Sequence, residues 1–141
     1  MPNPGPASTT TNHPSNLATN QALRLLASAQ SVNLNSVGDT VANLLNDSGN
    51  VSVQSIIVTN ASTNLTAAEL AVYTGAGATG TAIKTAYALS GNTTAAKVVI
   101  TAATSTDAID VNALYIRCTT VQGAAATADV FIYGYDLTFL P

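Results

Sequence analysis

The chain has 141 residues, a formal net charge of −3 and only 8% charged residues, while 47% of its residues are hydrophobic. This length suits a single domain that buries a core without help from disulfides or metals. Its four basic residues are scattered and form no stripe that could neutralise phosphates, so the composition argues against nucleic-acid binding; they are Arg24, Lys84, Lys97 and Arg117.

Low charge also predicts the character of the surface. Charged residues make up 8% of this chain, against roughly a quarter in ordinary soluble proteins, so Thr, Ser and Asn must keep the protein in solution. An uncharged surface rich in hydroxyl groups is compatible with dense assembly. We therefore expect a protein that works as part of an assembly.

The first twenty residues read as a flexible N-terminal arm. Residues 1–20 contain four of the five prolines together with Gly, Ser, Thr and Asn, a mixture that buries too little apolar surface to order itself. Such an arm is either an inert tail or a segment that orders against a neighbouring subunit. The arm has no positively charged start and no apolar segment, and no run of about 18 apolar residues occurs elsewhere. We expect neither a signal peptide nor a membrane span, and one domain over residues 21–141.

The next segment, ALRLLASA at residues 22–29, is ambiguous. It is long enough for a short helix, yet Leu23 and Leu25 alternate with Arg24 as they would in a strand. Periodicity over so few residues does not decide between the two.

Short runs rich in β-branched residues follow, separated by Asn, Gly, Ser and Asp. Turn signals stand at DSGN (residues 47–50) and SGN (residues 90–92), and no long amphipathic helix interrupts the runs. This spacing predicts an all-β fold, an antiparallel β-sandwich or jelly roll. The predicted strands are Thr40–Leu45, Val51–Asn60, Glu69–Tyr73, Ala82–Leu89, Lys97–Thr101, Ala113–Thr119 and Asp129–Phe139.

Two of these strands indicate how the core is built. Leu114, Ile116 and Cys118 share one face of their strand, which predicts a buried thiol at the only cysteine of the chain. The run from Ile56 to Val58 is apolar on both faces. A strand of this kind is covered on both sides, at the centre of a sheet or at a subunit contact.

The last strand alternates between an aromatic face and a smaller one. Phe131, Tyr133, Tyr135 and Leu137 fall on one side, and the residues between them fall on the other. Such a strand needs a packing surface on at least one face.

No motif in the sequence gives strong evidence of a nucleotide-binding, catalytic or metal-binding site. Gly75, Gly77 and Gly80 have the spacing of a dinucleotide-binding loop, but no acidic residue stands about 20 positions further on, so a flexible connection between strands is favoured. His13 is the only histidine and lies in the arm, which argues against a preorganised catalytic triad, and one His with one Cys cannot supply the usual ligands of a zinc site. Asp107 and Asp110 lack a third acid for calcium. We expect no enzyme activity, no cofactor and no metal.

Two stretches resemble a known family. The sequences IIVTNASTNLTAAELAVYTGAGATGTAI, from Ile56, and ALYIRCTTVQGAAATADVFIYGYDL, from Ala113, are similar to the head-decoration, or capsid cement, proteins of tailed bacteriophages. The resemblance covers roughly Val37 to Leu137. Its most specific parts are VTNAS after a buried strand, YTGAG before a glycine-rich loop, and TTVQGAAATADV before the last strand.

The resemblance implies a β-sandwich on the outside of a virion capsid, made in the bacterial cytoplasm, that binds the major capsid protein as a homo-oligomer, with a trimer favoured. The alternative is a receptor- or carbohydrate-binding module of a phage tail or fibre, with tyrosines 73, 87, 115 or 133 as stacking platforms. The residues expected at the partner interface are those of the arm, the ambiguous segment and the aromatic face: Pro4, Pro6, His13, Leu17, Leu23, Leu25, Leu26, Phe131, Tyr133 and Tyr135.

Overall fold

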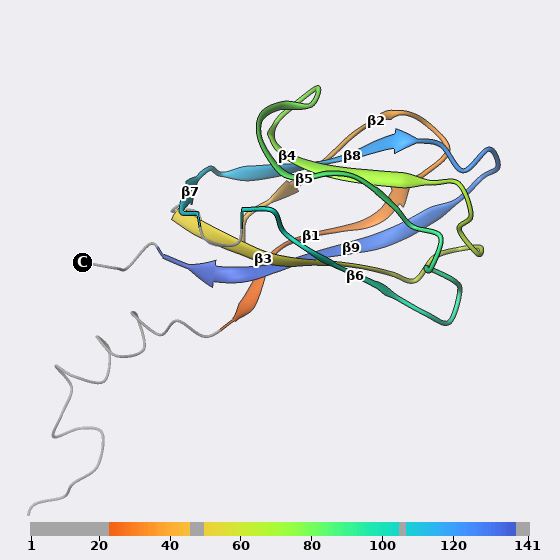
Figure 1. Cartoon of the computed structure of the whole chain (residues 1–141), viewed down its shortest axis with the longest axis horizontal. Coiled ribbons are helices and arrows are strands. Elements are labelled where there is room, and N and C mark those ends of the chain that lie inside the picture. The colour runs from red at the N-terminus through yellow and green to blue at the C-terminus, as the bar shows by residue number, and fades with distance from the viewer. Residues whose placement is uncertain (1–22, 46–49, 105–106, 138–141) are drawn as a thin grey trace, which may run out of the picture.

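The computed structural model describes residues 23–45, 50–104 and 107–137, and these form two antiparallel sheets packed face to face (Figure 1). One sheet has five strands in the order β1-β9-β3-β6, with β7 also paired to β3, and the other has four in the order β2-β8-β4-β5. The predicted antiparallel β-sandwich is confirmed. The predicted arm, residues 1–20, lies outside the described residues.

The two sheets are built from nine strands within the described residues. Their bounds are β1 Arg24–Asn33, β2 Gly38–Asn43, β3 Asn50–Thr59, β4 Glu69–Gly75, β5 Thr79–Ala88, β6 Val98–Thr101, β7 Ile109–Asp110, β8 Ala113–Thr120 and β9 Thr127–Asp136. The seven strands expected from the sequence are all present, with ends shifted by a few residues. The two-residue β7 was not predicted, because so short a pairing carries no periodic signal.

The ambiguous segment forms most of strand β1. It pairs with β9 along its length, with Leu25 opposite Tyr133 and Ser28 opposite Phe131. The register shifts at two places in this pairing, the second of them at Ser31, which has a positive φ of 53°. The partner strand therefore decides the conformation that the local pattern left open.

The core lies between the two sheets and is filled by aliphatic side chains. Leu114, Ile116 and Cys118 point inward from β8, and each is at most 1% exposed, so the predicted buried thiol is confirmed. Ile56 and Val58 enter the same core from β3, which lies between β9 and β6. The strand with two apolar faces thus lies inside its sheet, as its sequence indicates.

Strand β9 turns its smaller side chains toward the core. Val130 and Ile132 are fully buried, while Phe131, Tyr133 and Tyr135 are half-buried on the opposite face. A side chain at Gly134 would overlap the backbone oxygen of Ser52 on β3, so glycine permits the close approach of these two strands. The aromatic face of β9 is consequently the outer face of the five-stranded sheet.

Candidate interaction surface

The outer face of the five-stranded sheet carries a continuous apolar belt. Val99 of β6 lies opposite Ile57 of β3, and Ile57 lies opposite Phe131 of β9. The next row along the strands places Tyr133 opposite Leu25 of β1. We call these five residues the aromatic belt: Leu25, Ile57, Val99, Phe131 and Tyr133.

Hydroxyl groups, not charges, fill the positions between the belt residues. Phe131 lies opposite Ser28, Tyr133 lies opposite Ser55, and Ser55 lies opposite Thr101. Neither of the two rows that cross the four strands here contains a charged residue. Aromatic enrichment with depletion of charge is typical of the centre of a protein interface.

The nearest acid on this face is engaged with its own chain. Asp129 lies one outward position before Phe131, and its Oδ1 accepts a hydrogen bond from the Ser31 amide at 2.8 Å. Its Oδ2 accepts another from the Asn60 side-chain amide at 2.9 Å. These bonds, that of Asn60 first, lower the pKa of Asp129. Its carboxylate therefore ties together three segments at the end of the belt.

The residues expected at a partner interface differ in their exposure and location in the structure. Leu23 is 53% exposed, and Leu25 is half-buried beside Tyr133. Leu26 corrects the expectation, because the register shift between Leu25 and Ala27 places it in the core, where it is 4% exposed. Phe131, Tyr133 and Tyr135 share the outer face of β9. The remaining expected residues, in the arm, lie outside the described residues: Pro4, Pro6, His13 and Leu17.

The candidate stacking tyrosines do not form one platform. Tyr73 of β4 lies opposite Tyr115 of β8, and Val41 of β2 lies on the other side of Tyr115, all on the outer face of the four-stranded sheet. Tyr133 lies on the other sheet. Tyr87 is on β5, where the Lys84 ammonium stands 5.3 Å from its ring centre.

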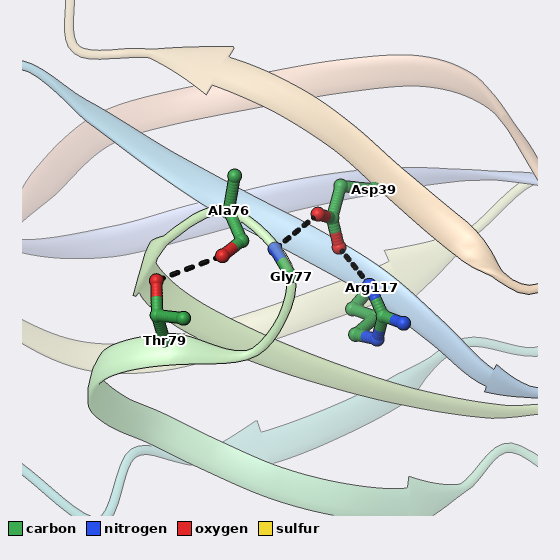
Figure 2. A network of polar contacts seen from close by, with 5 residues as sticks. All are labelled: Asp39, Ala76, Gly77, Thr79 and Arg117. Carbon is green, nitrogen blue, oxygen red and sulfur yellow. Dashed lines mark hydrogen bonds and ion pairs between the residues drawn. The ribbon is translucent and has the colours of Figure 1, made fainter.

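A polar clamp holds the loop between β4 and β5 against the four-stranded sheet (Figure 2). The Gly77 amide donates to Asp39 Oδ2 at 2.6 Å, and Arg117 Nη1 donates to Asp39 Oδ1 at 2.8 Å. Asp39 is on β2 and Arg117 on β8, at directly opposed positions. The clamp joins three elements that are distant in sequence, and no local motif reveals it.

The electrostatics of the clamp follow from these contacts. The hydrogen bond from the Gly77 amide, together with the hydrogen bond and the positive charge of Arg117, holds the pKa of Asp39 below its usual value. Gly77 and Gly80 have positive φ values of 68° and 73°, which glycine adopts without strain. The glycines therefore shape a hairpin turn, and the connection expected to be flexible is tied down at Gly77. Because β4 and β5 pair antiparallel, the parallel unit of a dinucleotide-binding loop is not formed.

The other two segments that carry the resemblance also act as loop tethers. In TTVQG, Gln122 Oε1 accepts hydrogen bonds of 3.1–3.2 Å from three consecutive backbone amides before β4. In VTNAS, Ser62 Oγ accepts from the Thr127 amide at 3.0 Å, and the Ser62 amide donates to the Thr127 oxygen at 2.9 Å. These residues fix loops and create no reactive group.

Two hollows flank the sheets. One is lined by Leu26, Leu44 and Val51, among others, and holds an ion pair of 3.9 Å between Arg24 and the buried Asp136. The other is a polar cleft lined in part by Thr74, Thr81, Asp107 and Asp110. Within the described ranges, no group of three or more His, Cys, Asp or Glu side chains could hold a metal.

Comparison of the chain with known protein families, with curated proteins and with solved structures found no match. The described segments contain no helix with the length and apolarity that a membrane crossing requires. The resemblance to decoration proteins stays a prediction.

Proposed function

We propose that the protein is a structural virion component that decorates a bacteriophage capsid from outside, binding the major capsid protein across capsomer boundaries as a homo-oligomer. The observation that carries the proposal is the aromatic belt, a set of apolar side chains on the outer face of the five-stranded sheet whose two rows contain no charged residue. The core packs against the inner face of this sheet, and the outer face exposes Val99 by 55%. Contiguous apolar surface of this kind marks interaction sites.

Adhesion through many weak contacts fits the rest of the molecule. Rigid strands present the belt, and the Asp39 clamp and the Gln122 tether hold connecting loops in fixed positions. An oligomer that contacts several capsid subunits at once gains avidity without any single strong contact. The resemblance favours a trimer for this oligomer, and the capsid lattice supplies the effective concentration.

The direct test mixes the purified full chain with capsids assembled without it, followed by pelleting and quantification of bound copies. We expect saturable binding at hundreds of copies per particle and a higher temperature of capsid disruption. Protein that stays in the supernatant, or a particle that carries only a handful of copies, contradicts capsid decoration.

A second candidate is a carbohydrate-binding module on a tail or fibre. The observation in its favour is the cross-strand pair of Tyr73 and Tyr115 on the outer face of the four-stranded sheet, since tyrosine rings offer apolar faces with a polar tip. Binding on a glycan array that is lost in Tyr115→Ala, and kept in Tyr133→Ala on the other sheet, supports this function. The copy number per particle separates the two proposals.

A further inference from the structure

We infer that the side-chain amide of Asn92 binds a buried water molecule. This site lies in the interior of the fold and is independent of the proposed function. Asn92 belongs to the loop between β5 and β6, and 0% of the residue is exposed. Within the part of the chain that the structure describes, neither its Nδ2 nor its Oδ1 has a hydrogen-bond partner. The two atoms therefore need a partner that the surrounding protein groups do not provide.

The backbone of Asn92 is held on both sides, which keeps its side chain inside the protein. Its amide donates a hydrogen bond to the Leu89 oxygen at 2.8 Å, and its backbone oxygen accepts one from the Leu65 amide at 2.9 Å. Leu65 and Leu89 are themselves buried aliphatic residues. Because no part of Asn92 is exposed, its side-chain amide reaches bulk solvent only if this packing opens.

The turn that follows Asn92 is also fixed by hydrogen bonds. The Thr93 amide donates to the Ala96 oxygen at 3.1 Å, and Thr93 Oγ1 accepts from the amides of Ala95 and Ala96 at 3.2 and 2.9 Å. The Thr94 amide donates to Asn64 Oδ1, in the loop between β3 and β4, at 3.3 Å. The unpartnered amide of Asn92 therefore lies in a well-bonded part of the fold and not in a loose loop.

The hydrogen-bonding capacity of the amide defines its ligand. Oδ1 only accepts hydrogen bonds and Nδ2 only donates them, so a single ligand for both atoms must donate and accept. The groups that bond to Asn92 and to the turn after it are all uncharged, so an ion would have no counter-charge among them. A buried amide without partners costs more free energy than an ordinary hydrogen bond contributes. Water fits these requirements, since buried waters typically satisfy such polar groups.

The first test measures nuclear Overhauser effects between water and the side-chain amide protons of asparagines in the full chain. Asn43, exposed on β2, is the control in the same spectrum. We expect the Asn92 protons to show the sign of effect that a long-lived buried water gives, and Asn43 to show only that of mobile surface water. Rotating-frame measurements separate these effects from proton exchange. An Asn92 amide that behaves like that of Asn43, or shows no effect, overturns the inference.

The second test compares Asn92→Leu with Asn43→Leu by urea unfolding. Leucine is close to asparagine in size and apolar, so Asn92→Leu removes both polar atoms. If water satisfies the amide, the variant loses those hydrogen bonds, and its folding equilibrium constant relative to Asn43→Leu falls or rises less than tenfold. A rise of tenfold or more shows that the amide was truly unpaired and overturns the inference. If Asn92→Leu does not fold, the measurement on the wild type decides.

Discussion

Asp39 and Arg117 lie opposite each other on β2 and β8, and their ion pair of 2.8 Å supports the tip of the hairpin formed by β4 and β5. The same carboxylate accepts a hydrogen bond from the Gly77 amide. One acid therefore connects two of the four strands of its sheet, β2 and β8, with the loop between β4 and β5 (Figure 2). In a chain with 8% charged residues, we expect this contact to have a structural role that mutation can test.

Removal of this carboxylate should free the loop. In Asp39→Ala, the Gly77 amide loses its acceptor and Arg117 loses its partner, and we expect the free energy of unfolding to fall by about 1 kcal/mol because the pair is partly exposed. Hydrogen exchange of the Gly77 amide should accelerate by tenfold or more. Asp110→Ala, which removes an exposed acid from β7, is the control. Unchanged exchange at Gly77 in Asp39→Ala contradicts the clamp.

Acid should weaken the fold through two carboxylates. The pKa values of Asp39 and Asp129 are lowered in the folded protein, chiefly by hydrogen bonds from Gly77 and Asn60 respectively. On acidification the unfolded chain therefore binds protons before the folded protein does. The two carboxylates contribute fully to the free energy of unfolding above their unfolded pKa of about 4, and this contribution is lost as the pH falls through their pKa values in the folded protein.

Urea unfolding between pH 7 and pH 2 measures this loss. The wild type should lose stability below about pH 4, and Asp39→Asn combined with Asp129→Asn should give a flatter profile. Asp107→Asn, whose acid is exposed, should follow the wild type. A double variant with the same acid dependence as the wild type shows that other groups are responsible.

The contact at Gly134 should tolerate no side chain. An added Cβ would overlap the Ser52 oxygen and approach Leu26 Cδ1 at 2.8 Å, so Gly134→Ala forces β9 away from β3. We expect a loss of about 1–3 kcal/mol, the range for overpacked cores. Gly38→Ala is the matched control, since nothing lies within 4 Å of its added Cβ. Equal stability of the two variants contradicts the close approach.

Neighbouring residues of β9 should differ in their energetic roles. Ile132 is fully buried and Phe131 is half-buried on the outer face. Ile132→Ala should cost about 2–5 kcal/mol through loss of burial and a cavity. Phe131→Ala should cost less in the isolated domain, about 1–2 kcal/mol. Chemical denaturation at low protein concentration compares them, and a greater loss for Phe131 would place the aromatic face in the core.

The alternation of side chains made most of this fold predictable. In β8 and β9 burial alternates with the sequence, and most of the buried residues are aliphatic: Leu114 and Ile116 in β8, and Ala128, Val130 and Ile132 in β9. Which face of β9 would enter the core was not predictable, because both faces carry apolar residues. Leu25 lies in a strand and not in a helix because it pairs with β9, about a hundred residues away. Asp39 likewise pairs with Arg117, about eighty residues away. Local patterns do not contain such contacts, so the sequence indicated Leu25, Phe131 and Tyr133 as surface candidates but did not join them to Ile57 and Val99.

The single thiol provides a probe of global unfolding. Cys118 is 1% exposed and its Sγ lies 3.4 Å from the Thr120 oxygen, and burial raises the pKa of the thiol. Because the thiolate is the reactive form, a disulfide reagent should modify native protein only as fast as β8 opens. Low urea should accelerate the reaction in step with unfolding. Thr85→Cys in a Cys118→Ser background, at an exposed position of β5, should react at once. Rapid modification of native Cys118 would contradict its place in the core.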